Sequence, residues 1–221
     1  MAAKRKEAIV AVLLDRYGRT YAGEAGIRLA NKPAPLYQLL VLATLLSARI
    51  SAEIAVAAAK ELFAAGYRTP GAMLKASWQD RVDALGRGHY KRYDESTATR
   101  LGDGAELLGQ RWGGDLRKLH EEGGDDADRL AGLLTGFPGI GPAGASIFLR
   151  EVQGVWPGLA PCLDEKVLDG ARAVGLPDDP KAIADLADGA GELVRLAAAL
   201  VRVSLSGRAA AEVKAAGGEG A

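Results

Sequence analysis

The chain has 221 residues, of which 48% are hydrophobic, and its 28 basic residues balance its 28 acidic ones. This composition supports a folded core and argues against both a disordered chain and a non-specific polybasic binder. A single cysteine, Cys162, excludes an intrachain disulfide and a four-cysteine metal or iron–sulfur site. The sequence shows no signal peptide and no apolar run long enough to cross a bilayer, so we expect a cytoplasmic protein.

Apolar residues recur with helical spacing along nearly the whole chain, and no stretch alternates convincingly with the period of a strand. The sequence therefore predicts an all-α protein. Start signals such as Thr69-Pro70 and Ser77-x-x-Asp80 combine a capping side chain with proline or an acidic residue. The glycine-rich stretch at residues 213–221 is expected to fray. Helices are predicted to cover residues 5–17, 36–48, 89–110, 115–120, 143–153, 164–174 and 191–206. Further helices are predicted to begin at residues 51, 69, 77, 125 or 126, and 179.

A glycine-rich turn joins two of these helices at residues 133–145, and it is the most distinctive stretch of the chain. Gly139 and Gly141 flank Ile140, an apolar residue that can anchor the turn in the core. Glycine lets the backbone turn sharply and approach a ligand closely, and Pro142 fits the first position of the next helix. The N–H groups at a helix start favour an anion such as phosphate. By itself the stretch fits a DNA-binding helix-hairpin-helix element and an ordinary helix–helix turn equally well.

Four landmarks stand in a distinctive order along the chain. Residues 45–48 read Leu-Leu-Ser-Ala, residues 88–90 read Gly-His-Tyr, and residues 137–141 read Phe-Pro-Gly-Ile-Gly. Asp164 then lies 23 residues beyond Gly141. This order resembles the DNA glycosylases of the endonuclease III type, members of the helix-hairpin-helix (HhH-GPD) superfamily.

The resemblance extends over about residues 36–176 and implies a two-lobed helical fold with a cleft between the lobes. It places a central lobe at residues 34–153, with the helix-hairpin-helix at about residues 130–150. Residues 1–33 and 154–221 are expected to form the second lobe together.

The resemblance also implies roles for individual residues. Asp164 corresponds to an essential aspartate, whose carboxylate stabilises positive charge on the sugar and orients a water molecule. Arg49 takes the place of a side chain that fills the gap left by a flipped base, and His89 that of a second intercalating residue. Carbonyl groups near Phe137 and Gly139 are expected to hold a monovalent cation, Na⁺ or K⁺, as in relatives. The DNA-binding residues implied in this way are Gly139, Ile140, Gly141, Ala143, Gly144, Arg49 and His89.

Each of these side chains also has a plain structural interpretation. Asp164 can cap the helix that follows it, Arg49 can be a surface arginine at a helix end, and His89 can be a surface residue of a loop. The basic residues near the Gly-His-Tyr loop could line one DNA face; they are Arg87, Lys91, Arg92 and Arg100.

Residues of the base-recognition pocket are harder to assign, because an aromatic ring that stacks on a base and one that fills a core have the same sequence signal. Tyr37, Thr44 and Trp156 are candidates for the pocket, whereas Tyr21 and Trp112 fit a core position equally well.

Two departures from the family pattern decide the expected chemistry. Bifunctional members carry a lysine whose amine attacks the sugar, and this chain has Ala143 at that position. Lys166 follows Asp164 by two residues and is a poor substitute by geometry. The cysteine cluster that holds an iron–sulfur centre in many relatives is missing, so no cofactor of that kind is expected.

The sequence thus favours a monomeric, monofunctional DNA glycosylase of base excision repair, without lyase activity at abasic sites. Its expected substrate is double-stranded DNA with a damaged or mismatched base. Two alternatives stay open: a catalytically inactive protein that binds DNA structures or lesions, and a helical scaffold for protein partners.

Overall fold

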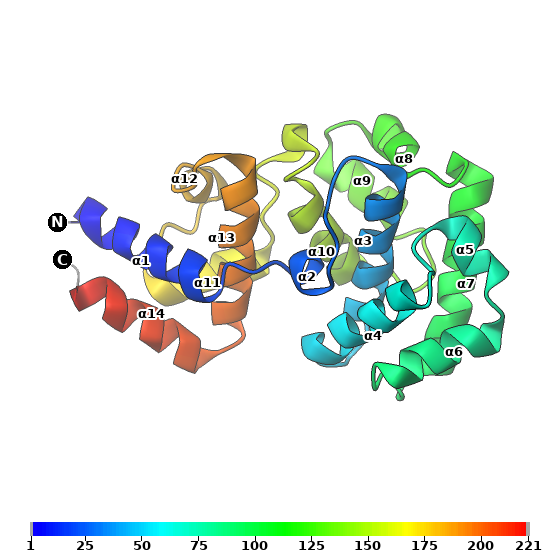
Figure 1. Ribbon diagram of the computed structural model, residues 1–221. Helices are drawn as coiled ribbons and strands as arrows, with labels where there is room; N and C mark the ends of the chain where they lie inside the picture. Colours follow the sequence, from blue (N-terminus) through cyan, green and yellow to red (C-terminus); the bar gives the residue numbers. More distant parts are fainter. Residues whose placement is uncertain (1, 220–221) are drawn as a thin grey trace. The chain divides into compact units, whose positions relative to one another are not determined.

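The computed structural model describes residues 2–219, and within this range it contains helices and no strand (Figure 1). The all-α prediction is therefore confirmed. No helix within these residues has both the length and the apolar character needed to cross a membrane. The α-helices are α1 (Ala2–Arg16), α2 (Tyr21–Glu24), α3 (Pro33–Leu46), α4 (Ala52–Ala64), α5 (Pro70–Lys75), α6 (Trp78–Arg87), α7 (Asp94–Trp112), α8 (Leu116–Gly123), α9 (Ala127–Leu134), α10 (Pro142–Val152), α11 (Glu165–Val174), α12 (Pro180–Ala184), α13 (Gly189–Ser204) and α14 (Gly207–Glu219), with a 3₁₀ turn at Pro157–Leu159.

The chain divides into two compact units, one of which is discontinuous in sequence. Unit 1 consists of Met1–Tyr21 and Gln153–Ala221, and unit 2 of Ala22–Val152. The sequence places residues 22–33 with the terminal segments, but in the structure they belong to unit 2.

The first residue of the segment 22–33 is fixed to α10. The backbone N–H of Ala22 donates a buried hydrogen bond of 2.9 Å to the side-chain carboxylate of Glu151. Glu151 is 3% exposed, so this acceptor is held inside the unit. No local sequence pattern signals a hydrogen bond between residues so far apart in the chain.

Unit 2 is built around α3, which packs against α4, α7, α8 and α10. Its apolar residues face all directions, and almost every side chain from Leu36 to Leu45 is buried. A helix that is apolar all round must be surrounded by other elements. In the structure, α4, α7, α8 and α10 surround α3 in this way.

Unit 1 contains α1, α11, α13 and α14, and α1 packs against α14 (Figure 1). The prediction of a frayed C-terminal segment is wrong for the described part of residues 213–221, because α14 continues to Glu219. Val213 is fully buried, and a Cβ built at Gly217 would lie 2.4 Å from the side chain of Ile9. Small residues allow α14 to approach α1 closely, so packing outweighs the low helix propensity of glycine.

The predicted helix starts carry the expected side-chain caps. Ser77 and Asp80 form a reciprocal capping box at the start of α6, and Thr69 accepts a hydrogen bond from the backbone of α5. The helix predicted from residue 89 begins later, at Asp94. His89 has a φ of 62°, which belongs to the left-handed region and is incompatible with a right-handed helix.

Candidate functional site

The turn between α9 and α10 is held rigidly by its own apolar residues. Ile140 is 4% exposed and its N–H donates to the Phe137 carbonyl at 3.1 Å. The Phe137 ring is 3% exposed and stacks on Trp112, with ring centroids 5.6 Å apart. Two buried anchors therefore fix the two partly buried residues between them, Pro138 and Gly139. The Phe137 carbonyl already accepts a hydrogen bond within the turn, and the monovalent cation expected there stays a prediction.

Three glycines of this region, Gly139, Gly141 and Gly144, differ in what requires them. Gly139 has a φ of 87°, which side-chain-bearing residues rarely adopt. A Cβ at Gly144 would lie 2.1 Å from the Ser47 hydroxyl, so this glycine lets α10 pack against the end of α3. At Gly141, in contrast, no atom of the described residues would lie within 4 Å of an added Cβ. The contacts of the protein therefore explain Gly139 and Gly144 but not Gly141.

The start of α10 presents backbone N–H groups next to Gly141. The Gly141 carbonyl accepts the first helical hydrogen bond, from Ala145 at 3.0 Å. Pro142 follows and has no N–H, and the next residue, Ala143, is exposed. N–H groups in the first turn of a helix have no acceptor within the helix and attract anions. The exposed Ala143 methyl group offers no nucleophile.

The end of α3 brings together the three sequence landmarks that lie in unit 2. Ser47, from the Leu-Leu-Ser-Ala segment, touches α10 at Gly144. The buried Tyr90, from the Gly-His-Tyr loop, donates a hydrogen bond from its hydroxyl to the Leu45 carbonyl at 3.3 Å. Arg49 follows Ser47 by two residues and is exposed. Segments separated by about forty or more residues in sequence therefore meet at one place.

The predicted intercalating residue His89 is exposed in its loop. The preceding Gly88 is required by close packing, because a Cβ there would lie 2.4 Å from the backbone of Ala58. This packing and the buried Tyr90 ring hold the loop on both sides of His89. The imidazole is thus presented at the surface by a fixed backbone.

Asp164 lies in unit 1 and forms the N-cap of α11. Its carboxylate accepts a hydrogen bond from the Val167 backbone at 3.2 Å, and its side chain is partly buried. The capping interpretation of this residue is therefore observed. Lys166, exposed on the first turn of α11, lies 3.8 Å from the Asp169 carboxylate.

The loop before Asp164 is held by Gln153, a residue that the sequence reasoning missed. The Gln153 amide donates to the Cys162 carbonyl at 3.0 Å and accepts from the Cys162 N–H at 2.9 Å. Gln153 is fully buried. A buried glutamine at the end of a helix has no distinctive local pattern, so only the fold reveals that it positions this loop.

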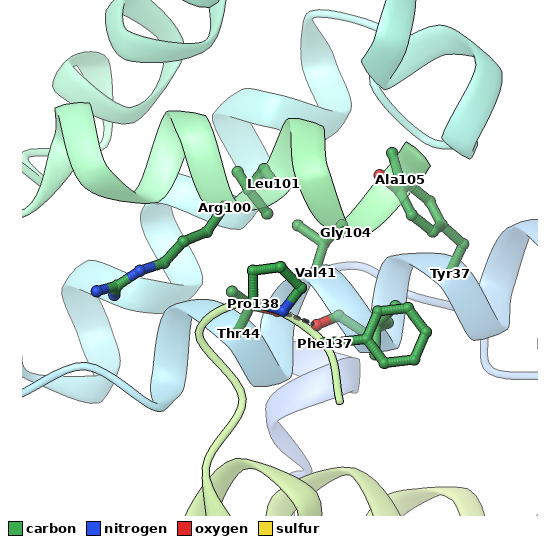
Figure 2. A pocket seen from close by; sticks show the side chains of 10 residues that line it. Tyr37, Val41, Thr44, Arg100, Leu101, Gly104, Ala105, Phe137 and Pro138 are labelled. Atoms are coloured by element: carbon green, nitrogen blue, oxygen red, sulfur yellow. Dashed lines mark hydrogen bonds between the residues drawn. The ribbon is translucent and has the colours of Figure 1, made fainter. Parts of the chain in front are cut away.

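The candidates for a base-recognition pocket are all buried side chains: Tyr37 is 2% exposed, Thr44 9% and Trp156 1%. Tyr37 and Thr44 line a small hollow between α3, α7 and the turn (Figure 2). Its accessible interior is only about 10 Å³, room for about one water molecule and far too little for a nucleobase. Burial raises the pKa of the Tyr37 hydroxyl, which has no hydrogen-bond partner among the described residues. Tyr21 and Trp112 are buried as well.

The predicted basic cluster does not act as one group. Arg87 forms an ion pair of 3.0 Å with Glu61, and Arg92 lies over the Tyr93 ring. Lys91 is exposed. Arg100 lies against the turn at Gly139. The structure therefore distinguishes Arg87, which has an acidic partner, from Arg100, which borders the turn at Gly139.

Comparison with known proteins yields a weak structural likeness. No protein-family model matches the chain, and no curated protein matches it. Among solved structures, the chain is similar to one described as a trapped endonuclease III–DNA covalent intermediate, an estranged-adenine complex. The likeness covers 89% of this chain and 85% of the other, with 17% sequence identity and a TM-score of 0.48. Values this low do not establish a common activity, so function must be argued from the residues.

Proposed function

We propose that this protein is a monofunctional DNA glycosylase that removes a damaged or mismatched base from double-stranded DNA. The observation that carries the proposal is the open space at the Cβ position of Gly141. A glycine stands there although no contact of the described protein requires it, and it adjoins the first-turn N–H groups of α10. Close approach of a backbone phosphate is the physical reason for a glycine at such a place.

The neighbouring surface supports a role in base flipping. Arg49 follows the end of α3 against which α10 packs, and the loop of His89 is fixed to the same helix end through Tyr90. An enzyme that acts on a base must first move it out of the stack, which leaves a gap beside the partner base. Arg49 can fill this gap and donate hydrogen bonds to the orphaned base, while His89 enters the stack nearby.

Asp164 supplies the chemistry in this proposal. Cleavage of the N-glycosidic bond develops positive charge at C1′, which a nearby carboxylate stabilises. The C1′–N bond breaks, a water oxygen bonds to C1′, and the proton released from the water offsets the charge on the departing base. Because Ala143 carries no amine, no Schiff base forms, and the products are the free base and an intact strand with an abasic site.

The test is incubation with duplexes that each carry one damaged or mismatched base, followed by analysis with and without alkali. We expect strand scission only after alkali, and no covalent adduct on treatment with borohydride. Scission without alkali together with a trapped adduct would contradict the argument from Ala143. Full activity of Asp164→Asn would contradict the catalytic assignment.

A second candidate function is recognition of DNA structures or lesions without catalysis. The observation that favours it is the use of the Asp164 carboxylate as the N-cap of α11, which is a structural task. Tight binding to a duplex with an abasic-site analogue, with no base released from any lesion tested, would support this candidate over the glycosylase.

A further inference from the structure

Arg100 lies against the backbone of the turn at Gly139. A Cβ built at Gly139 would be 2.9 Å from Cδ of Arg100 and 3.7 Å from its Cβ. The absence of a side chain at Gly139 therefore leaves room for the aliphatic part of Arg100 to cover the turn. Figure 2 shows the side chain leaving α7 beside Pro138, with its guanidinium group directed away from the hollow.

The charge of Arg100 is not neutralised by the part of the chain that the structure describes. Arg100 is exposed, and no carboxylate of residues 2–219 forms an ion pair with it. Three other arginines of unit 2 do have acidic partners: Arg87 pairs with Glu61, Arg111 with Glu122, and Arg117 with Asp115. The positive charge of Arg100 thus lies beside the turn proposed to bind an anion, and the aliphatic part of its side chain is already packed.

We propose that Arg100 binds the DNA backbone phosphate next to the one held by the turn. This inference rests on the proposed function, because it requires that the turn binds DNA. A guanidinium group donates two parallel hydrogen bonds to a phosphate, and a stem that is already packed loses less conformational entropy on binding. A phosphate contact of this kind adds affinity for any DNA sequence and makes binding more sensitive to salt.

The experiment measures binding to a fluorescent duplex that carries an abasic-site analogue, across a range of salt concentrations. Each phosphate contact contributes about 0.9 to the slope of log K against log salt concentration. We expect Arg100→Gln to reduce this slope by about 0.9, so that its loss of affinity over a fourfold rise in salt is about 3.5-fold smaller than that of the wild type. Arg100→Lys should keep the wild-type slope, because it retains the charge.

Arg111→Gln is the matched control, since it removes the same charge from the same helix. Arg111 already pairs with Glu122 at 2.7 Å, so its replacement should leave the slope unchanged. An unchanged slope for Arg100→Gln, with normal DNA binding by the wild type, would refute the role of Arg100 and leave the proposed function standing. Absence of salt-dependent DNA binding by the wild type would refute both the role of Arg100 and the proposed function.

Discussion

Replacement of Gly141 by alanine tests whether the turn binds phosphate by close approach. The new methyl group meets no atom of the described protein within 4 Å, and the φ of Gly141 is not in the left-handed region. Alanine restricts the unfolded chain, which favours folding by about 0.4–1 kcal/mol, but it is a poorer N-cap than glycine by roughly 1 kcal/mol. These terms nearly cancel, so we expect the free energy of unfolding to stay within about 1 kcal/mol of the wild-type value.

DNA binding by Gly141→Ala should fall much more than stability. A methyl group on the open side of the turn holds a phosphate away from the N–H groups of α10. A hydrogen bond to a charged group contributes about 1.5–3 kcal/mol, so loss of one such bond weakens binding by about 10- to 150-fold. Fluorescence anisotropy with a lesion-containing duplex measures this change, and urea unfolding measures the stability of the same variant.

Two other glycine variants make the comparison decisive. Gly109→Ala is the control, because Gly109 also has open space at its Cβ position but lies on α7, and it should bind DNA normally. Gly144→Ala should instead lose about 1–3 kcal/mol of stability, because its methyl group overlaps the Ser47 hydroxyl. Normal DNA affinity of Gly141→Ala would refute the reasoning that links the open glycine to phosphate.

Three further predictions concern Asp164, Tyr37 and the capping box of α6. Asp164→Asn should change the free energy of unfolding by less than about 0.5 kcal/mol, because asparagine is an equally good N-cap. The rate of base release should fall at least about 100-fold. A loss of activity that only matches a loss of stability would indicate a structural role alone. Tyr37→Phe should leave the melting temperature unchanged or raise it, because the buried hydroxyl has no partner among the described residues, and a clear decrease would show that the hydroxyl is satisfied. Hydrogen bonds from Ser77 hold the pKa of Asp80 below its ordinary value. The capping box therefore stabilises the fold fully when the pH is above that ordinary value, and it loses this effect as the pH falls through the lowered pKa. The difference in melting temperature between the wild type and Ser77→Ala should therefore narrow as the pH falls below the ordinary pKa of an aspartate, and a constant difference would contradict the coupling.

Local signals in the sequence were sufficient for most helix starts. Thr69, Ser77 and Asp126 each cap the helix that follows, as predicted, because a capping hydrogen bond joins residues only two or three positions apart. The same locality explains the errors. The left-handed conformation of His89 comes from a loop held against α3 and α4, and the order of α14 comes from its contact with α1.

The sequence by itself determined the all-helical class, the presence of a Gly-Ile-Gly turn between two helices, and the absence of an amine at Ala143. These properties follow from residue identity and from neighbours along the chain. Only the tertiary structure decided that Tyr37 and Thr44 are core residues and that Arg87 is neutralised whereas Arg100 is not. It also distinguished Gly141 from the two glycines that packing requires. The physical reason is that burial, ion pairing and close approach depend on segments distant in sequence, which a local pattern does not record.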